Sequence, residues 1–318
     1  MKTENHINKV LLAVDGSDQA LGAVHYVSRI FPCDRTEVVL FHVENDIPDL
    51  LLDMNKLPLI GNKISDLSLN GRHKDRRRFM SEFMEKSVAI FRSEGYPAEF
   101  IHQKVRKKHH GISRDIIEES SKGYGALVVG RSGLSRLKDI MIGSTPIRLI
   151  DKVRKIALII VGGRPLAKKL LVCVDGSEQS VLAVRFVGNL LGSSGCRVEL
   201  CHVIKSLDSF KVGSDRLYLP EQEQTWQHLN QSIIEPAMKE AHRHLVEFGF
   251  VPDHVVSRIM PREISRSGAI IKEARSGGFE SIVVGRRGLN VVEEIVLGRV
   301  SKKVLEAAGK IAVWMVFE

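Results

Sequence analysis

The stretch that decides the fold is Gly130-Arg131-Ser132-Gly133, which directly follows a short apolar run at residues 126–129. A run of this length, ending in β-branched residues, predicts a buried parallel strand covered by helices on both faces. Ten residues further on, Gly143-Ser144-Thr145 precedes a helical pattern. The first amides of a helix lack intrahelical partners, and glycine lets an anion approach the backbone closely. The two motifs together therefore predict a cradle for a nucleotide phosphate.

The same unit occurs twice along the chain. Asp15-Gly16-Ser17 follows one apolar run, and Asp175-Gly176-Ser177 follows another 160 residues later. Gly285 repeats Gly130 at a spacing of 155 residues, and later landmarks keep that spacing. Constant spacings over a whole chain indicate a duplicated unit.

Each unit alternates strand patterns with helix patterns, which predicts an α/β fold with a mostly parallel, doubly wound sheet. We expect two tandem domains at residues 1–163 and 166–318, joined by a short linker. The last strand of each domain, residues 156–161 and 311–317, is apolar on both faces. Unpaired, such a strand would be an aggregation template. We therefore expect these strands to pair with each other or with a second molecule in a homodimer.

Composition limits the classes of function. A net charge of +9 suits an anionic ligand, and Arg76-Arg77-Arg78 is a local basic cluster. Only 6% of residues are aromatic, and none interleave with the basic stretches, so we interpret the cluster as a solvated face and expect no nucleic-acid partner. No run approaches the roughly 18 apolar residues of a membrane span, and the start lacks the apolar core of a signal peptide. We expect a soluble cytoplasmic protein whose four cysteines are reduced.

These motifs resemble tandem universal stress proteins over nearly the whole chain. The resemblance is carried by the strands ending at Asp15 and Asp175, by the His-Val strand ends, and by the spacing G-x2-G-x9-G-S/T. That spacing is similar to the nucleotide-binding signature of the family's ATP-binding branch. The resemblance implies two five-stranded parallel sheets of order 3-2-1-4-5 with helices on both faces. It also implies ATP where strands one and four diverge, in agreement with the rule for open α/β sheets.

Carried over residue by residue, the resemblance implies two groups of ligand contacts. The adenine and ribose would meet Ala13, Val14, Asp15 and Val43, and the phosphates would meet Gly130, Ser132, Gly133, Gly143, Ser144 and Thr145. Asp15 can accept hydrogen bonds from the nucleoside or help to hold magnesium beside the phosphates. One alternative stays open, since Asp15, Ser144 and Thr145 could instead cap the helices that follow them.

Other residues near the motifs carry weaker signals. Arg131 lies either over the phosphates or in solvent. His42 and His202 are expected to be packed, hydrogen-bonded strand residues, because no serine or cysteine nucleophile is paired with them in sequence. Met and aromatic residues at helical spacing are interpreted as core. This predicted stripe comprises Phe79, Met80, Phe83, Met84 and Phe91 in the first half, and Trp226, Leu229, Ile233, Ala237, Ala241 and Leu245 in the second.

The second half departs from the motif at one position. The residue after Gly298 is Arg299, where the first half has Ser144. Arginine accepts no hydrogen bond and is bulky where a phosphate would approach. Either this site binds poorly, which we favour, or the arginine contacts phosphate directly and alters the ligand.

The sequence favours an ATP-binding regulatory protein over an efficient enzyme. A phosphate-transferring enzyme of the common type would contain G-x4-G-K-S/T, and the chain lacks it. Slow ATP hydrolysis through a metal-bound water is one alternative. The other is a protein-interaction module in which nucleotide plays no part.

Overall fold

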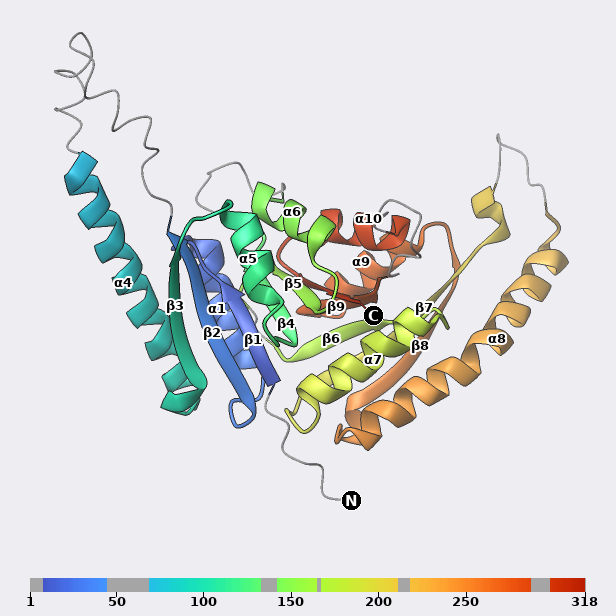
Figure 1. Cartoon of the computed structure of the whole chain (residues 1–318). Coiled ribbons are helices and arrows are strands. Elements are labelled where there is room, and N and C mark those ends of the chain that lie inside the picture. The colour runs from blue at the N-terminus through green and yellow to red at the C-terminus, as the bar shows by residue number, and fades with distance from the viewer. Residues whose placement is uncertain are drawn as a thin grey trace, which may run out of the picture.

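Strands and helices alternate through both halves of the chain (Figure 1). The structure is a computed structural model that describes residues 8–44, 69–132, 142–164, 167–210, 218–286 and 298–317. The first half contains β1 (Asn8–Ala13), α1 (Asp18–Ile30), β2 (Thr36–Glu44), α4 (Leu69–Ser93), η2 (Ala98–Phe100), β3 (Ile101–Lys107), α5 (Ile112–Ser120), β4 (Ala126–Gly130), α6 (Ser144–Lys152) and β5 (Ala157–Val161). The second half contains β6 (Lys169–Cys173), α7 (Glu178–Leu191), β7 (Arg197–Lys205), η3 (Leu207–Phe210), α8 (Pro220–Glu247), η4 (Pro252–His254), β8 (Val255–Glu263), α9 (Arg266–Ser276), β9 (Ser281–Gly285), α10 (Arg299–Ala307) and β10 (Ala312–Val316).

The strands form one ten-stranded sheet in the order β3-β2-β1-β4-β5-β10-β9-β6-β7-β8. Within each half every strand pair is parallel, and the order is 3-2-1-4-5. The predicted fold, two tandem doubly wound α/β units, is confirmed. In the first half the winding reverses between β1 and β4, which is where ligands bind in open α/β sheets.

Two hydrophobic cores cover the two faces of the sheet. Along β1 the buried side chains alternate, with Val10 and Leu12 in one core and Leu11 in the other. This follows from the two-residue period of a strand. Helices α1, α4, α7 and α8 pack on the first core, and α5, α6, α9 and α10 pack on the second. Near-continuous apolar strands are thus buried on both faces, as the sequence predicted.

The two halves meet along β5 and β10, which pair antiparallel within this chain. Trp314 of β10 lies opposite Ile159 and is fully buried. Its Nε1 donates to the Tyr26 hydroxyl at 2.7 Å, and that hydroxyl contacts Ser281 Oγ. Burial raises the pKa of Tyr26. A helix of the first half is therefore joined by hydrogen bonds to two strands of the second.

The predicted apolar stripe of the second half needs correction. On α8 Ala241 and Leu245 are buried as predicted, but Leu229 is 52% and Ile233 67% exposed. Gln227, Ile234 and Met238 are buried in their place. Both sets of residues satisfy helical periodicity, and contact with the sheet and α7 selects between them.

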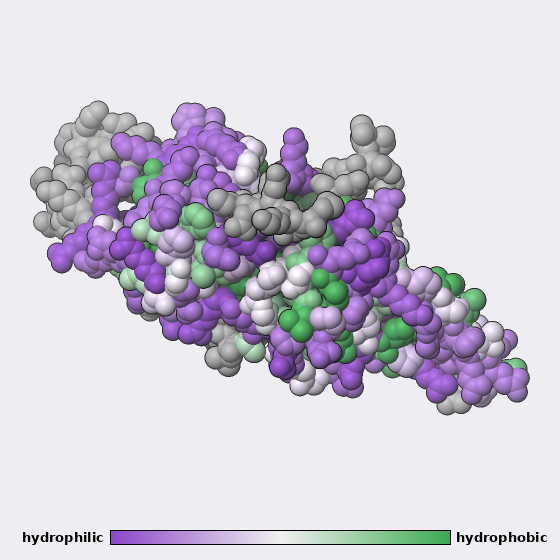
Figure 2. All heavy atoms as spheres, turned by 90° about the horizontal axis from the view of Figure 1, so that it is seen from below, coloured by the Kyte–Doolittle hydropathy of each residue, from purple (hydrophilic) through white to green (hydrophobic). Residues whose placement is uncertain are grey.

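The surface of this sheet and its helices is mostly hydrophilic on the face seen in Figure 2, with hydrophobic patches toward the side on which α7 and α8 lie. In the part of the chain that the structure describes, no helix is long and apolar enough to cross a membrane. The four cysteines are free thiols.

Candidate functional site

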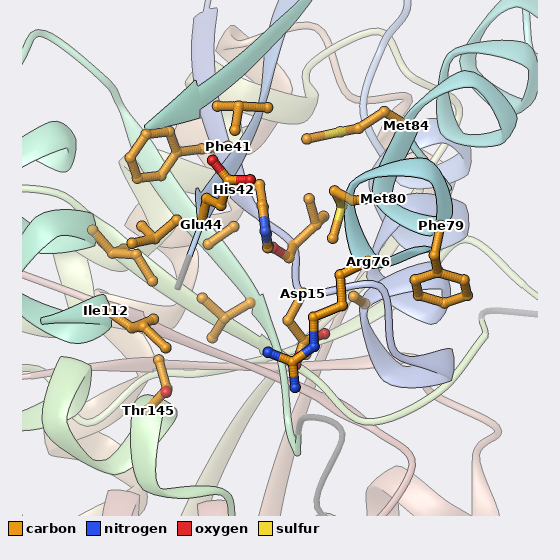
Figure 3. A pocket seen from close by; sticks show the side chains of 18 of the residues that line it. Asp15, Phe41, His42, Glu44, Arg76, Phe79, Met80, Met84, Ile112 and Thr145 are labelled. Atoms are coloured by element: carbon orange, nitrogen blue, oxygen red, sulfur yellow. The ribbon is translucent and has the colours of Figure 1, made fainter. Parts of the chain in front are cut away.

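A cavity of about 680 Å³ lies at the carboxyl ends of β1, β2 and β4, beside β3. Helix α4 covers one side with Phe79, Met80 and Met84, while Ile112 and Thr145 line the opposite side (Figure 3). The walls are mostly apolar with a few polar groups. Pockets of about 300–1,000 Å³ with this character are typical of small-molecule sites.

The structure gathers nine of the ten residues that the sequence marked as ligand contacts. The nine that line the cavity are Ala13, Val14, Asp15, Val43, Gly130, Ser132, Gly143, Ser144 and Thr145. The tenth, Gly133, lies outside the described residues. Their roles toward a ligand stay predictions, but the local geometry decides between several alternatives.

Asp15 opens the turn between β1 and α1. Its Oδ1 accepts a hydrogen bond from the Ser17 amide at 3.0 Å, and the Ser17 hydroxyl caps α1 by accepting from the Ala20 amide at 3.1 Å. The N-cap of α1 is therefore Ser17 and not Asp15. Gly16 has φ of +82°, and a β-carbon there would lie 2.6 Å from the Phe79 ring. The turn thus depends on glycine and holds Asp15 at the cavity wall.

Helix α6 begins at the cavity, and no side chain caps its first turn. Gly143 is the N-cap, so Ser144 and Thr145 are the first two helical residues and do not cap the helix. The first helical bond runs from the Ile147 amide to the Gly143 carbonyl at 3.2 Å. The amides before Ile147 have no intrahelical acceptor, as at any helix start. Pro146 lies within this first turn, where its missing amide costs no helical hydrogen bond.

Gly130 has a structural reason to be glycine. A β-carbon there would lie 2.9 Å from the carbonyl carbon of Gln19 in α1. Gly285 is in the same position against Gln179 of α7. Close helix-to-strand packing therefore requires these two glycines, whether or not a phosphate binds beside them.

Sequence reasoning missed the part of the cavity built by α4. Arg76 and Arg77 line it; both are exposed, so the predicted solvated face is confirmed, but the sequence did not show that this face borders the cavity. Arg77 Nε pairs with Glu44 Oε1 at 2.5 Å, and Figure 3 shows Arg76 reaching toward Asp15. The only sequence signal was the predicted core stripe of this helix. Met80 and Met84 belong both to the core and to the cavity wall, but Phe79 is 53% exposed, so the prediction of Phe79 as a core residue is wrong.

The two strand histidines are packed and hydrogen-bonded, which confirms the prediction. His42 Nδ1 lies 2.9 Å from the Val14 carbonyl oxygen, and His202 Nδ1 lies 2.7 Å from the Val174 carbonyl oxygen. Burial lowers the pKa of His202. Through this contact each histidine ring holds the backbone between the end of its neighbouring strand, β1 or β6, and the aspartate turn that follows.

Arg131 is neither over the phosphates nor in solvent. Its side chain is 5% exposed and leaves the motif toward the second half, where its Nη2 donates to the carbonyls of Leu305 at 2.8 Å and Glu306 at 3.0 Å. Arg286 makes the reciprocal contact, with its Nη1 donating to the Ile150 carbonyl. Both arginines thus reach the last turn of a helix in the other half, where the helix dipole favours a cation.

The backbone of Arg131 also connects the end of β4 with the end of β5 and with the start of α6. Its amide donates to the Val161 carbonyl at 2.8 Å, and its carbonyl accepts from the Gly143 amide at 2.8 Å. The start of α6 is therefore attached to the same residue that bridges the two halves.

The second half arranges its corresponding turn differently. Asp175 Oδ1 accepts from both the amide and the hydroxyl of Ser177, at 3.1 and 2.5 Å. Burial by itself raises the pKa of Asp175, but these hydrogen bonds outweigh it and leave the pKa below its usual value. Arg299 is the first residue of α10, after the N-cap Gly298, and is exposed. The residues between Arg286 and Gly298 lie outside the described part of the chain.

Helix α8 is fastened to the strand ends near this turn. Trp226 Nε1 donates to the Lys205 carbonyl at 2.8 Å, and Gln227 Nε2 donates to the same carbonyl at 3.2 Å. Gln227 Oε1 also accepts from the Arg262 amide at 3.1 Å. In the first half, the corresponding helix presents Arg76 and Arg77 to the cavity instead.

The fold and cavity define a class of protein, tandem doubly wound α/β units with a ligand pocket at the strand ends. The sequence pattern of the Universal stress protein family matches residues 6–161 and again residues 167–316. The chain belongs to this family and contains two copies of its domain, as the sequence predicted.

Individual relatives are distant. Universal stress protein YxiE of Bacillus subtilis is 25% identical over 137 residues, which is 43% of this chain and 87% of that protein. A universal stress protein structure from Archaeoglobus fulgidus has a TM-score of 0.59 at 16% identity and covers 98% of both chains. A structure from Pseudomonas aeruginosa UCBPP-PA14, a putative universal stress protein, has a TM-score of 0.55 at 15% identity, covering 98% of this chain and 94% of that one. These two similarities support the two-unit fold.

Proposed function

We propose that the chain is a cytoplasmic adenine-nucleotide-binding regulatory protein that holds ATP in the cavity of its first half. The observation that carries the proposal is the gathering of nine motif residues around one cavity at the reversal of the sheet winding. The cavity, about 680 Å³, falls within the size range of small-ligand sites.

The walls suit the two chemical ends of a nucleotide. Val14, Val43, Met80 and Met84 offer an apolar slot for a flat base, and methionine adapts readily to such a shape. Asp15 accepts hydrogen bonds from hydroxyl or amino groups of the nucleoside. The phosphates would lie at the start of α6, where free amides, the Ser144 and Thr145 hydroxyls and the helix dipole favour an anion.

Two cationic side chains of α4, Arg76 and Arg77, line the cavity and suit an anionic ligand, and Arg76 reaches toward Asp15 (Figure 3). Among the described residues no cluster of three or more His, Cys, Asp or Glu could hold a metal ion. Asp15 alone fits magnesium that is bound mainly by phosphates and water, which takes one or two carboxylates.

The proposal assigns binding rather than rapid chemistry. The residues around the cavity include no lysine at the start of α6 of the kind that neutralises charge in fast phosphoryl transfer. A magnesium ion would supply Lewis-acid chemistry, and Asp15 would only orient the water beside it. At most, slow ATP hydrolysis is expected, so turnover above roughly 1 per second would contradict the proposal.

We further propose that the two halves of one chain pair with each other and take the place of two separate subunits. The antiparallel contact of β5 with β10 covers the apolar strand of each half. The outer strands β3 and β8 carry Lys104, Arg106 and Arg258, and charged residues discourage further edge pairing. A homodimer through β5 or β10 is therefore not required.

Ligand released from freshly purified protein tests the proposal. Mass spectrometry is expected to find an adenine nucleotide, and ATP with magnesium is expected to raise the melting temperature of protein freed of ligand. At 100 times the dissociation constant the rise corresponds to about 2.7 kcal/mol. No released nucleotide and no rise would leave the protein-interaction module as the better account.

A further inference from the structure

Cys173 and Cys201 form a pair of thiols at the carboxyl end of the sheet in the second half. Cys173 is the last residue of β6, and Cys201 lies opposite it in β7. Paired positions on neighbouring parallel strands place side chains on the same face, with the strands about 4.8 Å apart. The Sγ atoms are 3.9 Å apart. Disulfides span Cα separations of roughly 4.4–6.8 Å, so this pair stands within reach of a bond.

The duplicated unit shows how an oxidant would reach the pair. Cys173 and Cys201 follow Ala13 and Phe41 by 160 residues, and those two line the cavity of the first half. The thiols therefore occupy the positions that form a cavity wall in the sister unit. Cys173 is half-buried, whereas Cys201 is 1% exposed. A small molecule arriving at the strand ends would meet Cys173 first.

We propose that Cys173 and Cys201 form a reversible disulfide when the protein meets a small peroxide. The Cys173 thiolate attacks one peroxide oxygen, so that an S–O bond forms, the O–O bond breaks and water leaves after protonation. The Cys201 sulfur then attacks the Cys173 sulfur, forming the S–S bond and releasing a second water. Two thiols and one hydrogen peroxide give one disulfide and two waters.

The order of attack follows from the environments of the two thiols. Cys201 donates its proton toward Cys173, and this hydrogen bond together with burial raises the pKa of the Cys201 thiol. Cys201 therefore stays protonated until Cys173 has been oxidised. A small-molecule thiol restores the pair by exchange.

The bond would act directly beneath the aspartate turn of the second half. The Val174 amide donates to the Cys201 carbonyl at 2.9 Å, and Asp175 follows Val174. A disulfide would add a covalent link at this point. The first half has Ala13 and Phe41 there and no such link, so the site is particular to the second half and independent of nucleotide binding.

Peptide mapping of peroxide-treated protein tests the proposal. The reduced full-length chain is treated with graded hydrogen peroxide, then unfolded in denaturant and alkylated with iodoacetamide so that the buried Cys201 also reacts, and digested without reductant. The expected result is one cross-linked species joining the Cys173 and Cys201 peptides, which lose alkylation together and regain it with dithiothreitol. Cys33, also half-buried and remote from the pair in the sequence, is the matched control and should enter no cross-link. Oxidation of Cys33 while Cys173 and Cys201 stay alkylated would overturn the proposal.

Two variants check the order of attack. In Cys201→Ala, Cys173 should accumulate as sulfenic acid that dimedone traps. In Cys173→Ala, Cys201 should remain alkylatable at peroxide concentrations that fully convert the wild type. Alanine stands at the corresponding position 13 of the first half, so this second variant should fold. Equal oxidation of Cys201 in Cys173→Ala would contradict the mechanism.

Discussion

The two halves share one strand order and one pattern of buried faces, yet they differ at the strand ends. In the first half Ala13 and Ser144 face a cavity, whereas the second half has Cys173 and Arg299 at these positions. Glycine occupies positions 130 and 285 in the two halves, because a β-carbon at either position would clash with the backbone of the neighbouring helix. The packing of the fold therefore explains the glycines, whereas the residues beside them determine which ligand each half can bind. Variants that affect one half, or the junction between them, test this difference.

The largest effect is expected at the junction of the halves. Leu158 and Ile160 are fully buried on β5 and face the second core, so replacing both by lysine places charges without partners beside the junction of β5 with β10. Each unpaired buried charge should cost about 3–5 kcal/mol of unfolding free energy. Denaturant unfolding measures the loss, and small-angle scattering should show the halves separating. Unchanged compactness together with unchanged stability would contradict the pairing.

Ligand binding is expected to distinguish the two α-helix starts. Gly143 has φ of −63° and Gly298 has φ of −51°, so valine fits both backbones. Gly143→Val should block approach to the start of α6 and remove most of the ATP-dependent rise in melting temperature, up to about 2.7 kcal/mol at 100 times the dissociation constant. Gly298→Val is the matched control and should remove little. An equal loss from both variants would mean that the second half also binds.

The reciprocal arginines should matter for stability more than for binding. Arg131→Met leaves the Leu305 and Glu306 carbonyls without their donor and should lower the unfolding free energy by about 1–3 kcal/mol. The ATP-dependent rise in melting temperature should persist, because the Arg131 side chain points into the other half. Loss of that rise with unchanged stability would place Arg131 at the phosphates after all.

Arg286→Met gives an internal comparison for the same contact. Arg154 Nη1 also donates to the Ile150 carbonyl, at 3.4 Å, so one donor remains after the substitution. Position 309, the counterpart of Arg154, is glycine. Arg286→Met should therefore cost less than Arg131→Met in the same unfolding measurement, and the reverse order would contradict the contacts.

The smallest effect is expected on the stability of the protein at acidic pH. Partial desolvation opposes the charged form of Asp175, but hydrogen bonds from Ser177 hold the pKa of this carboxyl below its usual value. A carboxyl with a lowered pKa stabilises the folded state above its unfolded pKa, about 3.9, and this contribution disappears as the pH falls through the folded pKa. Because Asp175 is exposed, solvent screens this contribution, and Asp175→Asn should flatten the pH dependence of unfolding below about pH 4 by well under about 1 kcal/mol. Identical acid profiles would show that these hydrogen bonds contribute nothing.

The sequence predicted the fold well because its signals are periodic and duplicated. Strand runs, the aspartate turns and the glycine spacings fix the topology, and nine of the predicted site residues do share one cavity. It could not predict Arg76 at the cavity, because helical periodicity does not say how far α4 extends over the strand ends. It also could not find the partners of Arg131, since Leu305 lies 174 residues away in the chain. On α8 two stripes fit the period equally well, and only tertiary contact separates them.

The stoichiometry of ATP binding tests the central claim most directly. Isothermal titration of ligand-free protein with magnesium-ATP should give one site per chain, abolished by Asp15→Ala and retained in Asp175→Ala. Two sites per chain, or one site that Asp175→Ala removes, would contradict the assignment of ATP to the first half.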